Sequence, residues 1–152
     1  MAMTMETAAR AAELTGYTAT PEDERSLTDW FARYDALAER ADVEALADMA
    51  VFPMNTVTDD GAGNGSAAQS DRAAYVRSMA EVMGPIAGKV RFTSTRTPFF
   101  LSGAVVVVFT RSAAEVDGAT TEMHYVDVLV KADGEWRFQT MVQAGWGSEA
   151  MG

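Results

Sequence analysis

The sequence predicts an α+β domain in which three helices pack on a curved, mainly antiparallel sheet that is formed mostly by the second half of the chain. Two observations carry this prediction. Apolar residues recur at helical spacing in residues 21–40 and 71–83. After residue 88 the chain is rich in Val, Thr and aromatic residues, and short turn-like segments divide it into strands. A strongly curved sheet closed by a helix would form a cone-shaped pocket.

The first helix is expected at residues 21–40. Thr20 offers an N-cap, and Pro21 occupies the first helical position, where proline is favoured. Its inward stripe would consist of Leu27, Trp30, Phe31, Tyr34, Leu37 and Ala38. Residues 1–19 are expected to form a flexible, Ala-rich arm in front of a single domain at residues 20–150.

Shorter elements follow this helix. Asp42 is expected to cap a short helix that ends at Asp48, and residues 51–58 to form a strand. The strand would run into a Gly-rich loop that begins with Asp59 and Asp60. A further helix is expected at residues 71–83, with Met79 and Met83 on its buried face.

Four strands are expected in the remainder of the chain, at residues 89–97, 99–111, 119–131 and 135–146. The connections between them are short and contain turn residues, so these strands should form an antiparallel meander. The flat apolar run at residues 105–108 suits a sheet-to-sheet contact, and a homodimer is therefore expected.

Composition excludes several kinds of partner and chemistry. The 12 basic and 22 acidic residues give a formal net charge of −10, which disfavours nucleic acid and membrane surfaces. There is no cysteine and a single histidine, so disulfides, thiol catalysis and Cys or His metal sites are not expected, and neither is a cofactor. No apolar run is long enough for a secretion signal or a membrane span, so a cytoplasmic location is expected.

The most informative residue is Asp127, which lies in the middle of an apolar strand. Tyr125 and Leu129 share its face of the strand, which favours a position inside a pocket. Burying a charged carboxylate costs several kcal/mol unless it is paired or protonated. His124 has the opposite parity and is expected at the surface.

Three motifs then resemble the nuclear transport factor 2-like, or SnoaL-like, superfamily, and within it ketosteroid isomerase. Ala32-Arg33-Tyr34 on the first helix is similar to the helix that supplies the isomerase tyrosine. Residues 56–59, TVTD, resemble the strand that ends in the catalytic base, and residues 126–128, VDV, resemble the strand that carries a protonated aspartate. The resemblance covers about residues 27–146.

The resemblance implies an acid–base enzyme that handles enolates. Asp59 would be the base, with Asp60 as the alternative, while Tyr34 and Asp127 would donate hydrogen bonds to the enolate oxygen. The ligand would be hydrophobic and polycyclic or polyketide-derived, and it would contact four residues, namely Trp30, Met79, Met83 and Trp146.

Other readings stay open. Cyclisation, dehydration and isomerisation use the same layout of base and oxyanion donors. Epoxide opening would need Arg91 or Arg96 to point into the pocket, and a dehydratase would need His124 inside. The alternative to an enzyme is a non-catalytic ligand-binding or dimerisation module, for example an accessory protein of polyketide or enediyne biosynthesis.

Overall fold

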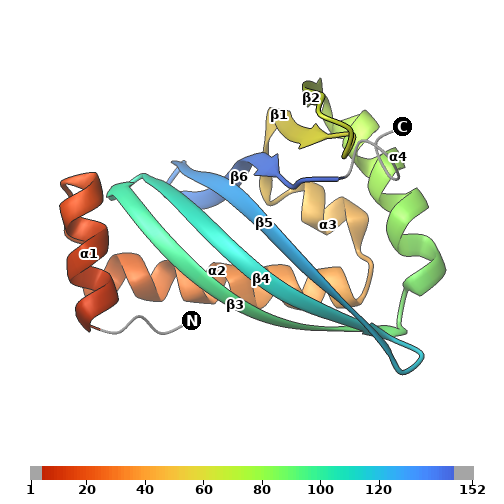
Figure 1. Cartoon of the computed structure of the whole chain (residues 1–152), viewed down its shortest axis with the longest axis horizontal. Helices are drawn as coiled ribbons and strands as arrows, with labels where there is room; N and C mark the ends of the chain where they lie inside the picture. Colours follow the sequence, from red (N-terminus) through yellow and green to blue (C-terminus); the bar gives the residue numbers. More distant parts are fainter. Residues whose placement is uncertain (1–4, 146–152) are drawn as a thin grey trace.

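A computed structural model describes residues 5–145 of the chain, with side chains from residue 8 onward. It contains four α-helices, one short 3₁₀ helix and one six-stranded sheet within this range (Figure 1). The elements are, in order, α1 Met5–Thr15, α2 Pro21–Glu39, α3 Val43–Ala47, β1 Ala50–Asp59, β2 Gly65–Ser70, α4 Arg72–Met83, η1 Gly84–Ile86, β3 Val90–Ser102, β4 Val105–Val116, β5 Ala119–Ala132 and β6 Glu135–Val142. The predicted α+β class is confirmed.

The sheet has the strand order β2-β1-β6-β5-β4-β3. Only β1 and β6 are parallel, and the other neighbours are antiparallel, so the predicted meander of β3 to β6 is confirmed. The β4–β5 and β5–β6 hairpins turn at Asp117-Gly118 and Asp133-Gly134, where all four residues have positive φ. Asp-Gly pairs suit such two-residue hairpin turns, because Gly has no Cβ and Asp tolerates the left-handed conformation.

Helix α2 begins and ends close to the prediction and runs along one face of the sheet (Figure 1). Thr20 and Asp23 form a capping box, in which the Asp23 backbone N–H donates to Thr20 Oγ1 at 3.0 Å. The Thr20 backbone N–H donates to Asp23 Oδ2 at 2.9 Å in return. The buried face of α2 packs on Leu129 and Phe138 from the sheet, with both α2 residues Leu27 and Trp30 almost fully enclosed.

The arm expected at residues 1–19 differs from the structure, which has helix α1 at Met5–Thr15. Alanine has the highest intrinsic helix propensity, so an Ala-rich segment readily forms a helix when it has a surface to pack on. That surface is β3, against which α1 lies, with Ala11 buried. The Tyr17 hydroxyl, just after α1, donates to Asp23 Oδ2 at 2.7 Å and links this segment to the start of α2.

Two strand predictions were wrong. The segment expected to be loop after residue 60 contains β2, which pairs with β1 over Gly65–Ser70. Its residues are small and exposed, so they carry no alternating apolar signal. A boundary expected between residues 97 and 99 is absent, because β3 continues through Pro98 to Ser102, and the turn to β4 falls inside the strand expected at residues 99–111. β3 lies at the edge of the sheet. Proline is tolerated in an edge strand because the position of its missing backbone N–H can face away from the neighbouring strand.

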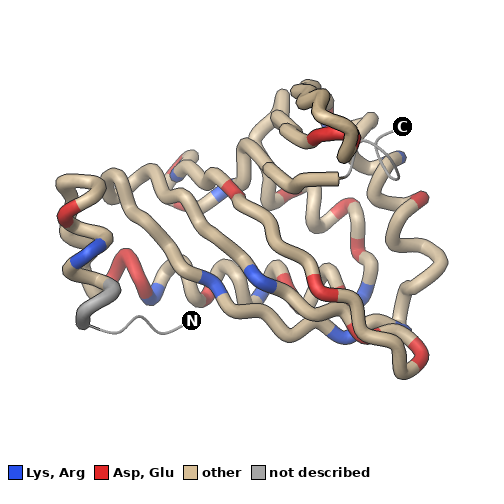
Figure 2. The backbone as a smooth tube through the Cα atoms, viewed as in Figure 1, with Lys and Arg blue, Asp and Glu red and all other residues tan. Residues whose placement is uncertain are grey.

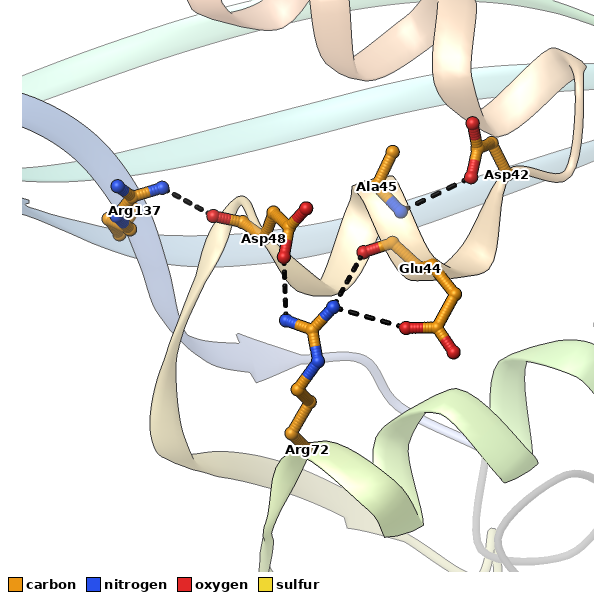
Figure 3. A network of polar contacts seen from close by, with 6 residues as sticks. All are labelled: Asp42, Glu44, Ala45, Asp48, Arg72 and Arg137. Atoms are coloured by element: carbon orange, nitrogen blue, oxygen red, sulfur yellow. Dashed lines mark hydrogen bonds and ion pairs between the residues drawn. The ribbon is translucent and has the colours of Figure 1, made fainter.

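Helix α4 lies at the same end of the molecule as β1 and β2 (Figure 1) and is attached to α3 by Arg72. One Arg72 nitrogen donates to the Glu44 carbonyl and carboxylate, both at 3.1 Å, and the other lies 2.8 Å from Asp48 (Figure 3). Arg137 of β6 donates to the Asp48 carbonyl. This network fixes α4 relative to α3 and the sheet, which matters because α4 forms one wall of the cavity described below.

Acidic residues are spread over most elements of the described chain, but residues 82–114, which include β3 and most of β4, contain none (Figure 2). No helix in residues 5–145 is long and apolar enough to cross a membrane.

Candidate functional site

A cavity of about 280 Å³ lies between α2, α4 and the inner face of the sheet. This volume is close to the lower limit of about 300 Å³ for small-molecule pockets. Much of its wall is apolar and flexible, and includes Met54, Met79, Val82, Met83, Phe92 and Met141. Methionine-rich walls adapt to ligands of irregular shape. The polar part of the wall includes Tyr34, Asp35, Tyr75, Ser94, Ser112 and Tyr125.

Asp127 lies on the inner face of β5, as its parity with Tyr125 and Leu129 predicts, and is only 5% exposed. Its cross-strand neighbours are Val108 on β4 and Met141 on β6. One carboxyl oxygen, Oδ1, is fully enclosed and has no hydrogen-bond partner among the described residues. Burial raises the pKa of Asp127 to about 7, although the positive charge of Arg96 acts in the opposite direction.

Three phenols of the cavity wall are close enough to Asp127 to respond to its charge. Burial raises the pKa of Tyr34, Tyr75 and Tyr125, and the negative charge of Asp127 raises each further. These hydroxyls therefore remain protonated at neutral pH and can donate hydrogen bonds. A group of neutral donors beside an apolar cavity suits stabilisation of an oxyanion on a ligand.

Arg96 of β3 points inward and forms a bidentate salt bridge with Asp35 of α2. Its two terminal nitrogens lie 2.8 and 2.6 Å from the Asp35 oxygens. The guanidinium carbon is 4.1 Å from the centroid of the Phe31 ring, a cation–π contact that fixes the orientation of the arginine. Arg96 is 7% exposed and Asp35 34% exposed, and only Asp35 belongs to the cavity wall.

The residues expected from the sequence fall into two groups. Tyr34, Met79 and Met83 line the cavity. Asp127 also lies on the inner face of the sheet, two residues after the wall residue Tyr125 on β5. It is not itself one of the residues that line the cavity. Trp30 is buried and stacks on Tyr34 with ring centroids 5.4 Å apart, so it supports the wall from behind.

The two expected base candidates lie elsewhere. On β1 the buried positions are Met54, Thr56 and Thr58, so Asp59 has the opposite parity and is not part of the cavity wall. Its Oδ1 accepts a hydrogen bond from the backbone N–H of Gly145. Asp60 is exposed and holds the loop together, since its Oδ1 accepts from the Ala62 and Asn64 backbone N–H groups at 2.7 and 3.2 Å. Trp146 lies outside the described residues.

Asp35 is a cavity residue that was not among the site residues predicted from the sequence. It follows Tyr34 and lies four residues after Phe31 and three before Ala38, both of which are buried on α2. Residues at these spacings share a helix face, so the position could have been recognised. His124 is exposed, as its parity predicts, and is 2.9 Å from Glu122.

Metal-binding side chains do not cluster in the described part of the chain: no group of three or more His, Cys, Asp or Glu residues there could hold an ion. The carboxyl and hydroxyl groups of this site can transfer protons and form hydrogen bonds. The carboxyl group of Asp35 and three phenols line one largely apolar space, and Asp127, whose pKa burial raises to about 7, lies on the same inner face of the sheet beyond Tyr125.

Comparison with solved structures identifies the fold. Similar chains include Aln2 from a Streptomyces species, at 19% identity and a TM-score of 0.67, covering 82% of this chain and 91% of that one. A nuclear transport factor 2-like protein from Pseudomonas putida has 11% identity and a TM-score of 0.68, with 82% and 87% covered. A protein named as a candidate scytalone dehydratase, from Novosphingobium aromaticivorans, has 18% identity and a TM-score of 0.57, with 78% and 80% covered.

Neither a scan of protein-family models nor a search of curated proteins gives a match. The fold and the cavity define a small α+β domain with a pocket enclosed between helices and a curved sheet. The chain has the nuclear transport factor 2-like, cystatin-like fold, as the sequence motifs predict.

Proposed function

We propose that the protein is a cofactor-independent acid–base enzyme that acts on a hydrophobic, oxygenated small molecule, of polycyclic or polyketide-derived type, through an enolate. The observation that carries the proposal is the buried Asp127, whose Oδ1 has no partner in the described chain and whose pKa is raised to about 7. A neutral carboxyl in that position can donate a hydrogen bond, which an apolar side chain of similar size cannot do.

In the proposed reaction the ligand enters the apolar cavity with a carbonyl oxygen directed toward Tyr34 and Asp127. Removal of a proton from the neighbouring carbon places negative charge on that oxygen, and the two O–H donors stabilise it. Return of the proton to another carbon completes an isomerisation, whereas attack of the enolate on a second carbonyl would complete a cyclisation. The largely apolar wall lowers the local dielectric constant and so strengthens these hydrogen bonds.

Exchange of α-hydrogen for deuterium in fused-ring ketones, such as 2-tetralone, tests this chemistry. Incubation in D₂O with the wild-type protein should remove the α-proton signal from the NMR spectrum faster than buffer does. Asp127→Asn and Tyr34→Phe should each slow the exchange by about 10²-fold, the usual loss for one oxyanion donor. Asp117→Asn, at an exposed hairpin tip, is the matched control and should exchange at the wild-type rate.

The second candidate function is binding without catalysis, which the size and apolar wall of the cavity favour by themselves. In that case the ketones would bind and quench the fluorescence of Trp30, which stacks on the cavity residue Tyr34, while no variant would change the exchange rate. A cytoplasmic location and a homodimer that uses the outer face of the sheet also belong to this proposal.

A further inference from the structure

Enolate chemistry needs a base as well as oxyanion donors, and Asp35 is the one acidic residue in the cavity wall among residues 5–145. Asp35 lies on α2 directly after Tyr34, so the tyrosine that would bind the carbonyl oxygen and this carboxylate come from neighbouring positions on one helix. The salt bridge with Arg96 uses both oxygens of Asp35. Each carboxylate oxygen has two lone pairs, so each can still accept from the cavity side.

Asp35 and Asp127 have different environments, and the difference suits Asp35 to act as a base and Asp127 to act as a hydrogen-bond donor. Asp35 is partly exposed and paired with a guanidinium, whereas Asp127 is enclosed by apolar neighbours such as Val108 and Met141. Arg96 connects the two, because it binds Asp35 and its charge also acts on Asp127. Tyr125 responds to the charge of both carboxyls, which places it near each of them. Enzymes often use two carboxyl groups with different environments, one as the acid and the other as the base.

Asp59 meets these requirements less well. Neither Asp59 nor Asp127 is in the cavity wall itself, but Asp127 faces inward next to the wall residue Tyr125, whereas Asp59 has the opposite parity to the inward residues of β1. Its Oδ1 is also engaged by the Gly145 backbone. A general base must come within hydrogen-bonding reach of the proton that it removes, so geometry favours Asp35.

We propose that Asp35 is the general base of this site and that Asp127, in its neutral form, is the paired hydrogen-bond donor. This assignment rests on the proposed function. The Asp35 carboxylate forms an O–H bond with the proton on the carbon next to the ligand carbonyl, and the C–H bond breaks. The electron pair moves into the enolate, whose oxygen accepts from Tyr34 and Asp127. The proton then returns from Asp35 to carbon, so no oxidant or further reactant is required.

The test compares Asp35→Asn with Asp59→Asn in the exchange assay with 2-tetralone, alongside ligand affinity from Trp fluorescence. Asp35→Asn should lower the exchange rate by about 10²–10⁴-fold, the usual contribution of a general base, and leave affinity within about threefold. Asp59→Asn should keep the wild-type rate. Asp35→Glu, which retains a carboxylate displaced by one methylene, should recover part of the rate.

A second variant covers the case in which Asp35→Asn does not fold, since it leaves the buried Arg96 charge without its partner. Asp35→Asn combined with Arg96→Met removes both charges and keeps an unbranched side chain against Phe31. This double variant should fold, bind the ketone and fail to exchange it. Exchange at the wild-type rate in either Asp35→Asn protein, or its loss in Asp59→Asn, would overturn the assignment to Asp35. Absence of exchange by the wild-type protein would overturn the proposed function itself.

Discussion

Burial changes the protonation of Asp127, because it raises the pKa of this residue from an ordinary value of 3.8 to about 7. Below about pH 4 the carboxyl is protonated in both folded and unfolded chains, and its contribution to stability is fully present. Between about pH 4 and 7 the unfolded chain releases the proton while the folded chain retains it. The free energy of unfolding contributed by this residue therefore falls as pH rises, and levels off above about pH 7.

Denaturant unfolding of the wild type and of Asp127→Asn, from pH 4 to 8, measures this effect. The stability of the wild type relative to the variant should decrease over that range by at most about 4 kcal/mol, since one pKa unit corresponds to about 1.4 kcal/mol. The difference between the two proteins removes the contributions of other groups, such as Asp23, whose pKa is lowered. A difference that stays constant with pH would mean that Asp127 ionises as freely in the folded protein as in the unfolded one.

At the level of single residues, a prediction from the sequence was confirmed where apolar and polar side chains alternate along a strand in the same order as buried and exposed positions. Asp127 was placed inward because Tyr125 and Leu129 share its face, and the structure agrees. On β1 the same reasoning gives little guidance, because the cavity face carries Thr56 and Thr58 while Val57 is exposed. The inward-facing positions at this end of β1 are threonines, so the usual rule of apolar residues inside does not identify the buried face there.

At the level of elements, helix ends were predictable because their signals are local. The capping box of Thr20 and Asp23 marks the start of α2, and the side chain of Asp42 caps α3, as predicted. Strand β2 and the continuation of β3 through Pro98 were not predictable, because each depends on which strand lies alongside. Helix α1 was missed for a similar reason, since the surface that it packs on is formed by the distant strand β3.

The Arg72 network provides a test of how α4 is held in place. Arg72→Ala removes the contacts with Glu44 and Asp48, which join α4 to α3. The side chain is 43% exposed, so the loss of stability should be modest, about 1 kcal/mol, and smaller at high salt. Ketone affinity should also fall by about two- to threefold, because α4 carries the cavity residues Met79 and Met83.

Arg77→Ala is the matched control, since Arg77 is exposed on the same helix and takes part in no ion pair within residues 5–145. Thermal unfolding and ketone titration should leave this variant close to the wild type. Equal effects of the two substitutions would show that Arg72 acts through general charge and not through its link to α3.

At the scale of the whole molecule, both faces of the sheet carry apolar residues, although the outer face also carries the exposed ion pairs of Glu122 with Arg111 and His124. The inner face packs on α2 and lines the cavity, while Phe109 and Leu101 on the outer face are 53% and 49% exposed. Phe99 and Phe109 form an edge-to-face pair there, with ring centroids 5.7 Å apart. Val126 and Val128 alternate with the inward residues of β5 and so lie on this outer face too. An exposed apolar sheet surface of this kind is characteristic of protein–protein contacts.

The outer face should therefore associate with the same face of a second copy of the chain. Phe109→Glu should convert the dimer to a monomer in sedimentation equilibrium, because it would place two further negative charges in the interface. Leu14→Glu, on the exposed side of α1, is the matched control and should stay dimeric. Since each chain has a net charge of −10, added salt should strengthen the wild-type dimer by screening the repulsion between subunits. A wild-type protein that remains monomeric at about 100 μM and high salt would contradict this assembly and leave the cavity chemistry unaffected, because none of the proposed catalytic groups lies on the outer face.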